Sequence, residues 1–252
     1  MKVKFILKQT GIAVGALTAY YALCFIFAQL IQGNNILLTF AIDIVGSVIG
    51  IVVLKKKYRW ESGQPPDKQT KVYIAAVMVL MSLASLMTAT YIMNHLLYDA
   101  SFAAYSQQID SSRTGGLATV LSIAMTVIAA PIMEEVLFRG FIFRAFYDIN
   151  PIAGYVINIF LFAVMHGTII HLPIAIAGAV VLSRVYEKSH KLRYNMAAHM
   201  LYNLSVTVLG SLTYPSIFFT GWMTMLIDII LLIFITMLFF LWNKDVLHVN
   251  KQ

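Results

Sequence analysis

The sequence predicts an all-α, polytopic membrane protein, a bundle of about eight transmembrane helices with the N- and C-termini in the cytoplasm. Hydrophobic residues make up 60% of the 252 residues and charged residues only 12%, a balance too apolar for an ordinary soluble domain. Long apolar runs recur along the chain, and the basic residues gather in alternate segments between them. We therefore expect a single intramembrane domain over 1–252, whose chemistry-bearing core covers about 117–212.

The apolar runs define the candidate spans. They cover about 11–31, 36–54, 72–96, 117–138, 152–170, 172–186, 195–212 and 218–242. The first run follows Met1-Lys-Val-Lys, as in a signal peptide. It nevertheless has the roughly 20 residues that a spanning helix needs, and no small-residue cleavage site follows it. We therefore interpret it as a retained first helix.

The basic residues support this division of the chain. If the N-terminus is cytoplasmic, 17 of the 18 Lys and Arg residues fall on cytoplasmic segments, and only Arg113 lies outside. Basic residues concentrate on the cytoplasmic side of membrane proteins, so the count favours an even number of spans. The net charge is +7. Because the basic residues gather in the segments between the predicted spans, they indicate the lipid bilayer, not nucleic acid, as a partner.

Small residues predict where helices approach closely. Gly11 and Gly15 share one helical face, and so do Gly46 and Gly50. Small residues at this spacing let membrane helices pack tightly. We expect both pairs to pack within the bundle. The oligomeric state is left open by the sequence.

Two adjacent carboxylates stand inside the fourth predicted span, in the stretch Pro131-Ile-Met-Glu-Glu-Val-Leu-Phe-Arg-Gly140. An ionised group at membrane depth costs at least about 2.5–3.5 kcal/mol, so each carboxylate is expected to have either a pairing partner or a functional role. Glu135 and Arg139 are four residues apart and are expected to form an ion pair. Glu134 points elsewhere and is the freer acid. Pro131 lacks an N–H, and we expect it to kink or open the helix so that water reaches Glu134.

Few other polar or ionisable residues, which are unfavourable in a membrane interior, lie in the predicted spans. They are Asp43, Asn158, His166, His199, Asn203 and Asp228. Asn158, Phe162 and His166 share one face of the fifth span, and His199 and Asn203 share one face of the seventh. A turn near 148–151 predicts an antiparallel hairpin that brings Glu134 and His166 to similar depth. For Asp43 and Asp228 we expect capping, water contact or hydrogen bonds between helices.

A carboxylate, two histidines and an amide in a wet pocket favour peptide hydrolysis. Glu134 can act as general base on a water molecule shared with one imidazole. The other imidazole and the Asn203 amide can stabilise the oxyanion. In the alternative, a divalent metal such as Zn²⁺, held by the two imidazoles with Glu134 or Asn203, acidifies the water. The sequence has no His-Glu-x-x-His motif, and an amide is an unusual zinc ligand, so we favour metal-free chemistry.

Three motifs within about 131–203 resemble those of the CAAX-processing and bacteriocin-processing (CPBP, or Abi) intramembrane proteases. The motif Glu-Glu-x-x-x-Arg matches Glu134-Glu135-Val-Leu-Phe-Arg139. Phe-x-x-x-His matches Phe162-Ala-Val-Met-His166, and His-x-x-x-Asn matches His199-Met-Leu-Tyr-Asn203. Each motif alone is weak, but all three occur in order on separate predicted spans.

The resemblance implies an intramembrane endopeptidase that acts on a peptide or on a membrane-associated protein, lipidated or not. It implies that Glu134 and His166 activate water and that His199 and Asn203 stabilise the oxyanion. It also implies that Glu135 and Arg139 shape the site. The family is labelled a metalloprotease family, although a glutamate mechanism has also been argued for it. Bacterial relatives suggest a bacterial plasma membrane as the location.

Two other functions are compatible with a polytopic chain of this kind. One is a non-catalytic immunity or regulatory scaffold, against which the intact set of motifs argues. The other is a proton-coupled transporter that uses Glu134, Asp43 or Asp228 as carriers. The lack of an evident internal repeat disfavours a transporter.

Overall fold

The computed structural model describes residues 2–30, 35–57, 65–95, 116–167 and 171–213, together with Leu226 and Ile230. Within these ranges every regular element is a helix, so the all-α prediction is confirmed. The first three helices are α1 (Lys2–Leu30), α2 (Asn35–Lys57) and α3 (Lys68–His95). The predicted span at 218–242, with Asp228, lies outside the described residues apart from Leu226 and Ile230.

One long composite helix follows. It consists of α5 (Gly116–Ala124), the π-helical η1 (Met125–Ala129), α6 (Ala130–Glu134), the π-helical η2 (Glu135–Phe143) and α7 (Arg144–Tyr147). Three further helices come after it: α8 (Pro151–Met165), α9 (His171–Ser189) and α10 (Leu192–Thr213). The fourth predicted span thus continues beyond residue 138 to Tyr147, because Arg139 is buried and paired inside the bundle and does not mark a membrane surface.

Four of the described helices are long and apolar enough to cross a membrane. They are Val3–Gln29, Leu37–Lys56, Lys68–Ala89 and Gly116–Tyr147, and Pro151–Met165 is a shorter apolar helix. Large apolar side chains stand exposed on these helices, among them Phe25, Val120 and Phe160. Exposed apolar faces of this extent suit contact with lipid. The chain is therefore a multi-pass membrane protein.

The predicted hairpin between the fourth and fifth spans is present. Asn150 caps α8, because its side-chain oxygen accepts hydrogen bonds from the backbone N–H groups of Ile152 and Ala153. Pro151 occupies the first turn, where no N–H is needed. The helix ends at Met165, earlier than the predicted residue 170. Gly167 adopts a φ of +67°, a left-handed conformation that stops a helix and suits glycine.

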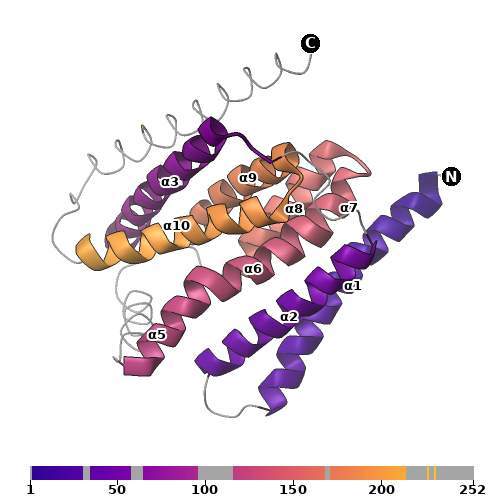
Figure 1. The fold of residues 1–252 in the computed structure, drawn as a ribbon, viewed down its shortest axis with the longest axis horizontal. Helices are drawn as coiled ribbons and strands as arrows, with labels where there is room; N and C mark the ends of the chain where they lie inside the picture. The colour runs from indigo at the N-terminus through magenta and orange to yellow at the C-terminus, as the bar shows by residue number, and fades with distance from the viewer. Residues whose placement is uncertain are drawn as a thin grey trace.

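The composite helix lies between α1 and α2 on one side and α3, α8, α9 and α10 on the other (Figure 1). Helix α2 packs closely on it through the second glycine pair. A Cβ added at Gly46 would lie 2.8 Å from Met133 Sδ, and one at Gly50 would lie 2.3 Å from Val136 Cγ1. For the first pair no described atom lies within 4 Å of a Cβ built at Gly11 or Gly15, so the described residues show no close approach there.

The core that positions the two glutamates surrounds η2. Leu137, Phe138 and Ile142 are buried there and pack in one cluster with Phe162 of α8 and Ala179 of α9. The rings of Phe138 and Phe162 meet edge to face at 4.9 Å. Since these side chains fill the space around η2, the rotation of the composite helix about its axis is fixed, and with it the direction of each glutamate.

Candidate active site

The composite helix departs from α geometry on both sides of Pro131. In η1 the N–H of Ala130 donates to the carbonyl of Met125, five residues back. The Thr126 carbonyl would take its helical hydrogen bond from residue 130 or 131, but Ala130 is already committed and Pro131 has no N–H. Asn203 of α10 supplies the missing donor, with its Nδ2 2.8 Å from the Thr126 oxygen. The opening of the helix at Pro131 therefore frees the Thr126 carbonyl, and this carbonyl holds the side chain of Asn203 in place.

Glu135 is fully buried and accepts hydrogen bonds from three side chains. Arg139 Nη1 lies 2.8 Å from its Oε1, as the i, i+4 spacing predicts. His199 Nδ1 lies 2.8 Å from the same oxygen, and Asn195 Nδ2 lies 2.5 Å from Oε2. The guanidinium also donates to the Ala179 carbonyl and lies over the Phe162 ring. Pairing and multiple donors are what allow a charge to be buried at such depth.

His199 lies between the two glutamates. A carboxylate only accepts, so the contact with Glu135 places a hydrogen on Nδ1 of the imidazole. The other ring nitrogen, Nε2, lies 3.7 Å from Oε2 of Glu134. Two carboxylates and one guanidinium surround this ring. Nε2 of His199 faces the side of Glu134.

His166 stands at the C-terminal end of α8, where the helical ladder is already breaking. Its backbone N–H donates to Ala163, which leaves the Phe162 carbonyl without its usual partner. The imidazole Nδ1 lies 2.8 Å from that carbonyl oxygen. Because a carbonyl only accepts, Nδ1 carries the hydrogen, and in the neutral ring Nε2 is left as the basic nitrogen.

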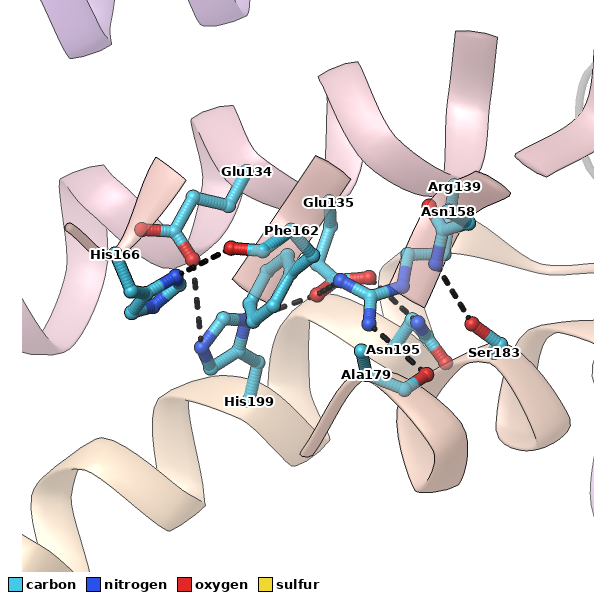
Figure 2. Close-up of polar contacts among 10 residues, drawn as sticks. All are labelled: Glu134, Glu135, Arg139, Asn158, Phe162, His166, Ala179, Ser183, Asn195 and His199. Atoms are coloured by element: carbon cyan, nitrogen blue, oxygen red, sulfur yellow. Dashed lines mark hydrogen bonds and ion pairs between the residues drawn. The ribbon is translucent and has the colours of Figure 1, made fainter. Parts of the chain in front are cut away.

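A cavity of about 330 Å³ joins these groups. Its polar wall includes Glu134, His166, His199 and Asn203, and its apolar wall includes Met78, Met81, Met125, Ile174, Leu182 and Val206. The side chain of Glu134 is 30% exposed, whereas that of Glu135 is 0% exposed. Figure 2 shows the Glu134 carboxylate directed toward the rings of His166 and His199, with Glu135 turned away to Arg139 and Asn195.

The structure thus brings Glu134, His166, His199 and Asn203 to one cavity and places Glu135 and Arg139 behind it. Asn158 lies on the predicted face of α8, but its Nδ2 donates to Ser183 Oγ of α9 at 2.9 Å, so it joins two helices. Asp43 is buried on α2 and is not part of the cavity wall. Its Oδ2 has no hydrogen-bond partner among the described residues.

The sequence analysis did not single out several polar residues of this region, among them Asn195, Tyr202 and His171. Asn195 holds Glu135, and its signal was available, since Asn195, His199 and Asn203 are successively four residues apart on one face of α10. Tyr202 and His171 also line the cavity. Neither belongs to a spacing pattern that would have singled it out.

The described side chains do not fit a metal centre as they are arranged. No group of three or more His, Cys, Asp or Glu side chains within the described ranges has the spacing to hold an ion. The Nδ1 atoms of His166 and His199 both donate to protein acceptors, which leaves Nε2 of each ring as the nitrogen that could bind a metal.

Fold and site together define a multi-pass helical membrane protein with one carboxylate and three imidazoles around an internal cavity. Residues 116–205 match a family model described as "Rce1-like: Type II CAAX prenyl endopeptidase Rce1-like". The match covers just over a third of the chain and includes all three motifs. It confirms the predicted resemblance to the CPBP/CAAX protease family. Comparisons with curated proteins and with solved structures gave no match.

Proposed function

We propose that the protein is an intramembrane endopeptidase, in which Glu134 activates a water molecule to hydrolyse a peptide bond. The observation that carries this proposal is the difference between the two adjacent acids. Glu135 has all its pairing within the protein, whereas Glu134 opens to the cavity beside two histidines. A partly solvated carboxylate beside imidazole nitrogens has the arrangement that general-base catalysis needs.

The hydrogen-bond pattern supports a proposed role for each side chain. Glu134, with the basic Nε2 of His166, draws a proton from the water as its oxygen attacks the carbonyl carbon. In the proposed step His199 carries a hydrogen on Nε2 as well as on Nδ1, and this Nε2 hydrogen and the second amide hydrogen of Asn203 donate to the oxyanion that forms. When the C–N bond breaks, Glu134 returns the proton to the leaving amine. Glu135 acts through His199, since it fixes the ring by holding Nδ1.

The proposal is metal-free, in line with the arrangement of donors described above. If a divalent metal such as Zn²⁺ were bound, its candidate ligands would be Glu134, His166, His199 and Asn203. Metal analysis of purified, active protein separates the two mechanisms. Undiminished turnover at negligible metal content supports the glutamate mechanism, and activity that follows the zinc content refutes it.

The proposed membrane arrangement is about eight spans with both termini in the cytoplasm, supported by the positions of the Lys and Arg residues. A bacterial plasma membrane is the proposed location. Single cysteines introduced near each terminus and near Arg113, in a Cys24→Ser background, test this topology with a membrane-impermeant thiol reagent. We expect external labelling only near Arg113, and external labelling at a terminus would refute the arrangement.

The substrate is proposed to be a peptide or a membrane-associated protein, lipidated or not. Mass spectrometry of membrane peptides from cells with the wild type or with His166→Ala should reveal fragments that only the wild type produces. Their new ends identify both the substrate and the cleaved bond. If the two peptide profiles agree while a biological effect persists, a non-catalytic scaffold is favoured. If only ion-coupled uptake changes, a transporter is favoured.

A further inference from the structure

Two hydroxyl groups meet in the wall of the cavity, on helices that the mechanism above does not connect. Ser85 belongs to α3 and Tyr202 to α10, and both residues line the cavity. Their oxygens lie 2.6 Å apart. Ser85 Oγ also lies 2.7 Å from the backbone carbonyl oxygen of Met81. This serine therefore contacts one group that only accepts and one that can either donate or accept.

A count of hydrogens fixes the direction of both bonds. The Ser85 hydroxyl has one hydrogen, and the Met81 carbonyl can only accept it. For the second contact to be a hydrogen bond, Tyr202 must donate to Ser85. The phenol hydrogen is then used within the protein, and no other described group is seen to donate to the Tyr202 oxygen. In the cavity, the Tyr202 oxygen can therefore act only as a hydrogen-bond acceptor.

An acceptor at this place complements the rest of the polar wall. His199 and Asn203, on the same helix as Tyr202, offer donors, which suit the carbonyl oxygens of a bound peptide. Each peptide unit also brings an N–H, and burying that N–H unpaired against an apolar wall costs binding free energy. The wall of Met78, Met81 and Leu182 offers only the thioether sulfurs of the two methionines, which are weak acceptors.

We infer that the Tyr202 oxygen accepts a hydrogen bond from one backbone N–H of the bound substrate, with Ser85 holding the phenol in the accepting orientation. Tyr202 is thus a substrate-positioning residue that selects a peptide with a free N–H at one defined position. This inference rests on the proposed function, because it takes the ligand to be a peptide. It adds a contact from a position that the third motif leaves unspecified, because Tyr202 is an x residue of His-x-x-x-Asn.

The test measures peptide binding without requiring cleavage. Short, fluorescently labelled apolar peptides are titrated against purified Glu134→Gln protein in detergent, and the best-bound member of the panel is remade with each backbone nitrogen methylated in turn. We expect methylation at one position to weaken binding by about 5–10-fold, the loss typical of one hydrogen bond. Adding Tyr202→Phe should weaken binding of the parent peptide by a similar factor and abolish the effect of methylation at that position.

The inference would be overturned if methylation weakened peptide binding equally at every position, both in the protein with Tyr202 and in the protein with Tyr202→Phe. Tyr194→Phe is the matched control, since Tyr194 is on α10 but outside the cavity wall and contacts Lys71 and Arg193. It should leave all affinities unchanged. In cleavage assays of the otherwise wild-type chain, Tyr202→Phe should raise KM and leave kcat within about twofold. A chain that binds these peptides but never cleaves them would refute the proposed hydrolysis and leave the Tyr202 contact standing.

Discussion

Glu134 and Glu135 are adjacent in the chain, but their side chains have opposite surroundings. Glu135 is enclosed by Arg139, Asn195 and His199, while Glu134 borders the cavity. The rotation of about 100° between neighbours on a helix is sufficient to separate them. Their substitution should therefore have different consequences, even though the chemical change is the same.

We expect Glu134→Gln to reduce turnover by about 10²–10⁴-fold, the usual contribution of a general base, while the thermal unfolding midpoint in detergent stays near that of the wild type. Glu135→Gln should lower stability by about 3–5 kcal/mol, because it leaves the Arg139 charge buried without its partner. Unfolding followed by circular dichroism, together with turnover, distinguishes the two. Equal destabilisation by both substitutions would contradict the different surroundings.

The ion pair of Glu135 with Arg139 follows from their spacing, but the tautomers of the two histidines do not. Nδ1 of His166 donates its hydrogen to the Phe162 carbonyl, which is freed at the end of α8, and that end depends on Gly167. Asn195 was missed because an amide in a membrane helix has many possible partners across helices. Only the packed bundle shows that it holds Glu135.

At the scale of the elements, the contact of α2 with the composite helix depends on Gly50. We expect Gly50→Ala to lower stability by about 1–3 kcal/mol, the usual cost of overpacking, because the new methyl would lie 2.3 Å from Val136 Cγ1. Gly11→Ala is the matched control and should be neutral within about 1 kcal/mol, since no atom of the described residues lies within 4 Å of the added Cβ. Unfolding in detergent measures both, and Val136→Ala should rescue the first. A neutral Gly50→Ala would refute the close contact.

The opening at Pro131 and the anchoring of Asn203 should be energetically coupled. Asn203→Ala leaves the Thr126 carbonyl unpaired, at a cost of about 1–3 kcal/mol. In a Pro131→Ala background the restored N–H can serve that carbonyl, so Asn203→Ala should cost less there. A double-mutant cycle on unfolding free energies should give a coupling of about 1–2 kcal/mol. Additive effects would show that the proline does not free the carbonyl.

The carboxylate of Glu187 connects α7, α8 and α9 at a position just beyond the predicted span 172–186. Burial opposes ionisation of Glu187, but hydrogen bonds from Tyr147 and Tyr155 and the ion pair with Arg184 outweigh it and hold its pKa below the ordinary 4.5. A carboxylate with a lowered pKa stabilises the fold at neutral pH, and this stabilisation is lost as the pH falls through the folded-state pKa. Glu187→Gln should therefore be less stable than the wild type at pH 7, with a difference that shrinks below about pH 4.5. A difference independent of pH would contradict the shift.

At the scale of the whole molecule, composition and charge placement predicted the all-helical, multi-pass class. Hydrophobic runs located the described helices to within several residues, with the largest differences at the long first helix and at the ends of the fourth and fifth spans. An opening of the helix at Pro131 was predicted, but its π-helical geometry was not, because apolar spacing does not distinguish π-helical from α-helical turns. The polar residues of the cavity were predicted to meet, but its apolar wall was not, since that wall comes from helices that are distant in sequence.

The most direct test of the central claim is cleavage of an identified peptide substrate by purified, metal-depleted protein in water enriched in ¹⁸O, with products followed by mass spectrometry. The wild type should release two fragments, with one ¹⁸O atom in the new carboxyl group, and folded Glu134→Gln should release at least about 10²-fold less. Cleavage by Glu134→Gln at the wild-type rate would contradict the claim that Glu134 activates the water.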